Sequence, residues 1–82
     1  MYDVIFSGNA KKQFLKLEKV MQARIVSALE RVRIRPAAYV TKLVGDPAFK
    51  LRVGDYRVLL EIDEGKLFIL VIKIGHIKNI YE

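Results

Sequence analysis

The segment FKLRVGDYRVLLEID, residues 49–63, predicts a β-hairpin. Gly54-Asp55 is a two-residue turn signal, and glycine in the first position suits a type II′ turn. With this turn, one face of the hairpin carries largely apolar cross-strand pairs: Val53 with Tyr56, Leu51 with Val58 and Phe49 with Leu60. Apolar residues at every second position are typical of a strand with one buried face.

The opposite face of the hairpin gathers cations. The same register places Arg52 opposite Arg57 and Lys50 opposite Leu59. Like charges that face each other across two strands destabilise a sheet. We therefore interpret the pair as part of a surface that binds a polyanion, with an ordinary solvated strand face as the alternative.

Length and composition narrow the class of protein. The 82 residues predict a single domain over 1–82. Because the chain has no cysteine and His76 is its one histidine, disulfides, thiolate chemistry and His-rich metal sites are excluded, and we expect neither metal nor cofactor. No signal peptide is visible, and the longest apolar run, residues 67–72, is too short to span a bilayer. A cytoplasmic protein without membrane contact is expected.

The net charge of +6 and the pI of about 9.8 constrain the partners. Such a charge favours nucleic acid, an anionic membrane or an acidic protein, although many basic domains are charged for solubility alone.

The first half of the chain predicts a strand and two helices. A short strand covers residues 2–6, and Ser7 is placed to cap the helix that follows. A change of apolar register near residues 17–20 separates the helices, and Pro36 ends the second one. Both helices carry an apolar stripe: Ala10, Phe14 and Leu17 in the first, and Met21, Ile25, Ala28, Leu29 and Val32 in the second.

The second half predicts a loop over residues 37–47 and strands near 48–53, 56–62 and 67–74. A three-residue loop over residues 64–66 would pair Leu60 with Leu70, Val58 with Ile72 and Arg57 with Lys73. That register leaves an apolar strip of Leu59, Ile69 and Val71 beside the cations, a feature that often marks an interface. The order βααβββ predicts an α+β fold, with two helices on one face of a mainly antiparallel sheet.

The tail GHIKNIYE adds polar and aromatic groups beyond the last strand. His76 can transfer a proton near neutral pH, Tyr81 can stack on a base, and Lys78 adds a cation. Each residue taken alone is better explained by packing or solvation.

Together, the hairpin and tail fit metal-independent RNA cleavage, in which the 2′-OH of the RNA attacks the adjacent phosphate. Lys50, crowded by other cations, or Glu61 would be the base, and Arg57 would stabilise the phosphorane. His76 would be the acid, while Arg52, Lys73 and Lys78 would bind substrate.

The sequence resembles the RelE/ParE superfamily of toxins from type II toxin–antitoxin systems along nearly its whole length. The resemblance rests on Phe6-Ser7 with Ala10, Lys12 and Lys16-Leu17, on Lys42-Leu43-x-Gly45, on the hairpin KLRVGDYRV, and on Gly75-His76 with Tyr81. It implies a helical hairpin packed on a twisted antiparallel sheet.

For the RelE branch, the resemblance implies a ribosome-dependent endoribonuclease that cleaves mRNA in the A site and so inhibits translation. The functional positions of the family fall here on Lys50, Arg57 and Tyr81, with further groups after Gly75. The resemblance also implies a cognate acidic antitoxin, similar to RelB, that wraps the toxin in a complex such as a hetero-tetramer.

One position departs from the family pattern. Ile77 stands where the family commonly has arginine, and an isoleucine can neither bind the scissile phosphate nor donate a proton. Loss of one transition-state donor costs about 10²–10³ in rate. Two alternatives follow: a ParE-like toxin that inhibits DNA gyrase without cutting RNA, or a weakly active homologue that acts mainly by binding its antitoxin.

Overall fold

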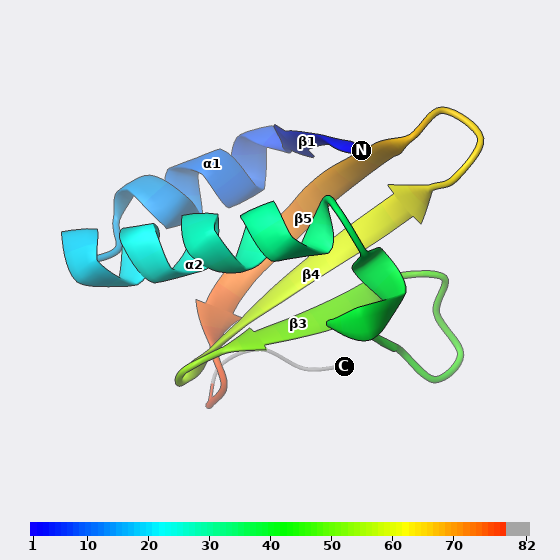
Figure 1. The fold of residues 1–82 in the computed structure, drawn as a ribbon. Coiled ribbons are helices and arrows are strands. Elements are labelled where there is room, and N and C mark those ends of the chain that lie inside the picture. Colours follow the sequence, from blue (N-terminus) through cyan, green and yellow to red (C-terminus); the bar gives the residue numbers. More distant parts are fainter. Residues whose placement is uncertain (79–82) are drawn as a thin grey trace.

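The computed structural model describes residues 1–78 and has two helices packed on a five-stranded sheet (Figure 1). This arrangement confirms the α+β class and the predicted βααβββ order. A two-residue strand, β2, lies within the predicted loop. The elements are β1 (Asp3–Phe6), α1 (Gly8–Leu15), α2 (Lys19–Val32), the 3₁₀ helix η1 (Pro36–Ala38), β2 (Thr41–Lys42), β3 (Phe49–Val53), β4 (Tyr56–Asp63) and β5 (Phe68–His76).

The sheet has the strand order β1-β5-β4-β3-β2. β1 runs parallel to β5, and the other neighbouring pairs are antiparallel. The first strand of the chain therefore lies beside the last one, and both helices cover the same face of the sheet (Figure 1).

The core lies between the two helices and the covered face of the sheet. Each fully buried aliphatic side chain contributes about 1.5–3 kcal/mol. The predicted helix stripes supply one side of this core, and alternating strand residues supply the other. Its fully buried members include Ala10, Ile25, Val32, Val58, Leu60, Ile69 and Val71. No helix within residues 1–78 combines the length and the apolar character that crossing a bilayer requires.

The predicted Ser7 cap is confirmed, and it has a second role. The Ser7 Oγ accepts a hydrogen bond from the Ala10 amide at 3.0 Å and donates one to the Ile72 carbonyl at 2.9 Å. Gln13 Oε1 accepts a bond from the Ile74 amide at 2.7 Å. Because β1 ends at Phe6, these two side chains satisfy backbone groups of β5 that lie beyond the reach of β1.

The β3–β4 hairpin matches its predicted register in full, including the Arg52–Arg57 and Lys50–Leu59 pairs. Gly54 has φ +59°, whereas Asp55 is not among the residues with positive φ. These signs are those of the predicted type II′ turn.

The predicted register of β4 and β5 is wrong. The turn between them spans residues 64–67, with Leu67 at φ +54°, so that Asp63 pairs with Phe68 and Leu60 with Val71. One additional turn residue reverses the faces of the following strand. Consequently Ile69 and Val71 are fully buried against the helices, and the predicted strip of Leu59, Ile69 and Val71 is not a surface feature.

A register shift at Leu59/Leu60 restores the original phase in the second half of β5. After the shift, Lys73 pairs with Leu59 and Gly75 pairs with Arg57, so the predicted Arg57–Lys73 pair is also wrong. Lys73 nevertheless lies on the predicted face, because a bulge of one residue inverts the alternation for a second time.

Candidate nucleic-acid interface

The face of the sheet turned away from the helices, which we call the open face, carries cations on three adjacent strands. Cross-strand pairing sets Lys50, Leu59 and Lys73 in one row. The next row holds Arg52, Arg57 and Gly75. Because neighbouring strands are about 4.8 Å apart, these cations lie within a patch the size of a few phosphate groups.

The four cations differ in exposure. Lys50 and Arg57 are half-buried, whereas Arg52 and Lys73 are exposed. Half-buried cations placed by rigid strands are suited to contacts that need fixed geometry, and arginine can hold a phosphate through two parallel hydrogen bonds. Exposed cations are suited to weaker contacts with the nucleic-acid backbone.

Arg52 does not extend straight out from the open face. Its Nε donates a hydrogen bond to the Gly54 carbonyl at 3.1 Å, and the side chain lines a hollow together with residues of α2. The side chain therefore reaches round the edge of β3. The Gly54 carbonyl thus gives Arg52 a polar partner at the turn, which helps the hairpin to tolerate two arginines at opposed positions.

Among the described tail residues, His76 does not join the open face. His76 pairs with Tyr56, whose alternation puts both on the helix side, and their rings make an edge-to-face contact at 5.3 Å between centroids. Lys78 is exposed beyond β5, and its amide donates to His76 Nδ1 at 3.2 Å. Ile77 donates its amide to the Asp55 carbonyl at 2.8 Å. Tyr81 lies outside the described residues.

The acidic groups near the cations are sparse. Glu61 is exposed on the open face, two residues along β4 from Leu59, as the alternation predicts. Within residues 1–78, no three His, Asp or Glu side chains are grouped as metal ligands. The described part of the open face is thus equipped to bind phosphate groups and to stabilise developing negative charge.

Sequence reasoning missed two cations on α2. Arg24 and Arg31 line the same hollow as Arg52, between α2 and the β3–β4 turn. A signal was present in the sequence, because Arg24, Ser27 and Arg31 recur at spacings of three and four and thus share one stripe of the helix.

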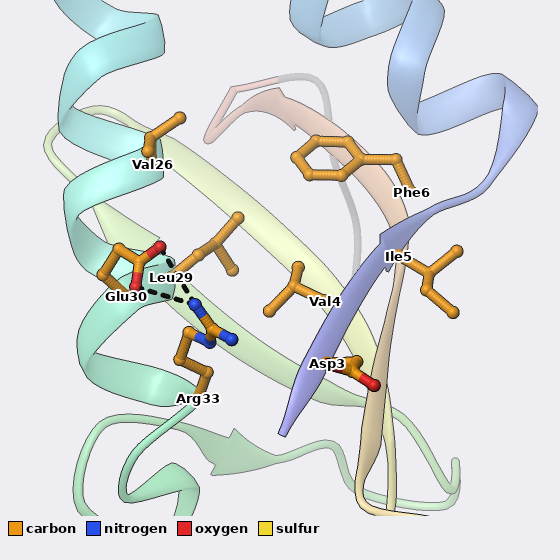
Figure 2. A pocket seen from close by; sticks show the side chains of 8 residues that line it. All are labelled: Asp3, Val4, Ile5, Phe6, Val26, Leu29, Glu30 and Arg33. Carbon is orange, nitrogen blue, oxygen red and sulfur yellow. Dashed lines mark hydrogen bonds and ion pairs between the residues drawn. The ribbon is translucent and has the colours of Figure 1, made fainter. Parts of the chain in front are cut away.

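A second hollow lies between the edge strand β1 and α2 (Figure 2). Val4 and Phe6 point toward α2, whereas Ile5 points to the other side of β1. The cation here, Arg33, forms an ion pair with Glu30 at 3.2 Å. This hollow is mainly apolar, and its positive charge is compensated, so it differs in kind from the cationic surface.

Comparison with known proteins gives the family. A sequence model described as the ParE toxin of type II toxin–antitoxin systems, parDE, matches residues 4–81. No curated protein sequence matches the chain.

Among solved structures, the chain is similar to a RelBE toxin–antitoxin complex from Mycobacterium tuberculosis, with 26% identity over 92% of this chain and 96% of that one, at a TM-score of 0.84. The intact Escherichia coli RelBE complex shares 28% identity over 93% and 96%, at 0.80. An archaeal RelE–RelB complex from Pyrococcus horikoshii is 22% identical over 96% and 98%, at 0.82, which bears on the fold alone. This chain therefore belongs to the ParE toxin family of type II toxin–antitoxin systems, within the RelE/ParE superfamily.

Proposed function

We propose that this toxin is a ribosome-dependent mRNA endoribonuclease whose substrate lies across the open face. The observation that carries the proposal is the patch formed by Lys50, Arg57 and Lys73, which three adjacent strands hold on one surface. The likeness to RelE toxins at 26–28% identity supports it.

The reaction needs no nucleophile from the protein. A base removes the 2′-OH proton, the 2′-oxygen forms a bond to phosphorus, and the bond from phosphorus to the 5′-oxygen breaks. The leaving 5′-oxygen takes a proton, so that a 2′,3′-cyclic phosphate and a 5′-OH result. Lys50 or Glu61 would act as the base, and the Arg57 guanidinium would stabilise the phosphorane.

The source of the final proton differs from the sequence-based hypothesis. His76 was the expected acid, but its ring packs against Tyr56 on the helix side of the sheet. We therefore assign the proton donor to the open face, where the Lys73 ammonium, across Leu59 from Lys50, is the candidate among the described residues. Tyr81 keeps its predicted role as a stacking or catalytic group, and Lys78 its role in substrate binding.

The test is transcript cleavage in a reconstituted translation reaction, read by mapping 5′ ends. Arg57→Ala should abolish cleavage while the circular dichroism spectrum stays that of the wild type. Lys66→Ala is the matched control, because Lys66 is an exposed cation in the turn at the far end of β4. Full cleavage by Arg57→Ala would refute the proposal.

A second function is favoured by two observations, the match to a ParE model and the isoleucine at position 77. In that case the toxin inhibits DNA gyrase and leaves RNA intact. Supercoiling assays with purified protein separate the two functions, since inhibition of gyrase without transcript cleavage supports the second.

The proposed partner in either case is a cognate acidic antitoxin in the cytoplasm. The net charge of +6 favours such a partner, and the structural relatives named above are toxin–antitoxin complexes. Co-expression with a short acidic protein from the adjacent reading frame should yield a stable complex. The mass of that complex will show whether it is a hetero-tetramer.

A further inference from the structure

The hollow between α2 and the β3–β4 turn is distinct from the row of cations on the open face. It has a volume of about 370 Å³ and lies on the helix side of the hairpin turn. Polar and small side chains form most of its walls. The lining residues are Ala23, Arg24, Ser27, Ala28, Arg31, Arg52, Val53 and Gly54.

Three arginines converge on this hollow from two elements. The Arg24 guanidinium lies over the turn, so that a Cβ built on Gly54 would meet Arg24 Nη1 at 3.0 Å. From the other side, Arg52 Nε donates to the Gly54 carbonyl at 3.1 Å, and Arg31 Nη1 donates to Ser27 Oγ at 3.3 Å. We call this set the arginine cluster.

Among the described residues, no carboxylate forms an ion pair with the arginine cluster, although Glu18 and Asp55 line an adjoining hollow that includes Arg24. Within residues 1–78, the one ion pair is Glu30–Arg33, and Arg33 is not part of the cluster. Each guanidinium carries five N–H donors, and the contacts named above use one donor each from Arg31 and Arg52. Most of the donors are thus available to an oxygen-rich anion, and such an anion would relieve the mutual repulsion of the three charges.

The cluster is continuous with the open face through Arg52. Its backbone pairs with Arg57, while its side chain turns round β3 into the hollow. β2 covers only Lys50 and Phe49 of β3, so no strand within residues 1–78 pairs with β3 at Arg52 on this edge. A sugar–phosphate chain that lies across the open face can therefore cross this edge and continue to Arg24 and Arg31.

We propose that the arginine cluster binds a phosphodiester of RNA that adjoins the segment held on the open face. This inference rests on the proposed function, in which RNA is the substrate. It adds a site remote from the chemistry, whose role is to hold the RNA chain and set its direction. A site of this kind contributes to affinity without touching the scissile phosphate.

The test measures RNA binding and omits cleavage. Fluorescence anisotropy with a 2′-O-methyl RNA of about 12 nucleotides, which cannot be cut, reports the dissociation constant over a series of salt concentrations. The variant is Arg24→Gln with Arg31→Gln. The control is Lys16→Gln with Lys66→Gln, which removes the same charge at exposed positions outside the hollow.

The arginine variant should bind the long RNA about 10-fold more weakly than the control variant, and the slope of log K against log salt concentration should fall by about 0.7, the value for one lost phosphate contact on a single strand. Binding of a trinucleotide, which covers only the open face, should stay unchanged. Equal thermal midpoints of the two variants show that folding is intact.

Equal losses of RNA affinity in the arginine variant and the control variant would overturn the inference by showing a general charge effect. So would a loss of polyglutamate binding in the arginine variant as large as its loss of RNA binding. A failure of the proposed function can be told apart from a failure of this inference. It would appear as a wild-type protein that does not cleave transcripts, and the binding comparison can still be read in that event.

Discussion

Replacing one isoleucine of β5 tests the strand register that defines the open face. Ile69 is fully buried, with Val4 and Ile62 as its partners on the flanking strands. Truncation of a buried isoleucine to alanine costs about 2–5 kcal/mol. Because Ile69 lies in an interior strand, between β1 and β4, where the neighbours cannot move in to fill the space, we expect Ile69→Ala to cost about 3–4 kcal/mol.

Ile72 provides the matched comparison. It is the residue added by the bulge and is half-buried, so Ile72→Ala should cost about 1 kcal/mol. The alternative register of β5, with a three-residue turn after β4, predicts the opposite order of costs, because it buries Ile72 and exposes Ile69. Two identical substitutions three residues apart therefore decide between the registers.

Urea unfolding followed by circular dichroism is the assay. An 82-residue domain has a stability of about 4–12 kcal/mol. Ile72→Ala should therefore retain a folded baseline, and Ile69→Ala should retain one unless the wild-type stability lies at the low end of this range. At about 4–8 °C per kcal/mol, the thermal midpoint of Ile69→Ala should fall by about 12–30 °C. If Ile72→Ala costs as much as Ile69→Ala, the register of β5 is wrong, and the pairing of Lys73 with Leu59 on the open face is wrong with it.

Three further substitutions test the backbone and the site. Gln13→Ala should destabilise the fold by about 1–3 kcal/mol in urea, because the Ile74 amide loses its acceptor, and Gln13→Glu should retain most of the stability. Gly54→Ala should cost about 1–2 kcal/mol from its φ of +59°, and Arg24→Gln should not rescue it, because the flexible Arg24 side chain can already move aside. Ile77→Arg should raise transcript cleavage about 10²-fold by supplying a donor near the phosphate; an unchanged rate would show that position 77 is remote from the chemistry.

The β3–β4 hairpin could be predicted in detail because its sequence is asymmetric. One face is apolar and the other is charged, so a slip of one residue would bury Arg52 and Arg57, and Gly54-Asp55 fixes the turn. The Ser7 cap and the two helix stripes were predictable for the same reason, because a shift of one residue would break each pattern.

β5 could not be placed in this way. Its sequence FILVIKI is apolar on both faces, so alternation does not tell which side is buried. Two features outside the strand accompany the observed register. One is the left-handed conformation of Leu67 in the preceding turn, and the other, remote in sequence, is the pair of side chains Ser7 and Gln13 that bind the backbone at Ile72 and Ile74.

The site residues also differ in how far the sequence alone predicts their positions. The shared face of Lys50 and Arg57 followed from the hairpin, and Lys73 reached that face although its predicted partner was wrong. The bend of Arg52 and the position of His76 on the helix side depend on tertiary contacts with the Gly54 turn and Tyr56. The meeting of Arg24 and Arg31 with Arg52 requires the packing of α2 beside the hairpin, which no local pattern specifies.

The pairing of β1 with β5 has a consequence for how the toxin is made. Residues 3–6 pair with residues 68–71, so the strand that joins β1 to the rest of the sheet is β5, which is synthesised after the other four. Until β5 emerges from the ribosome, neither the helices nor the hairpin have the surface that buries their apolar sides. Contacts so distant in sequence slow folding. Synthesis of β5, and not of the elements that precede it, is then the event that allows the nascent chain to close its core.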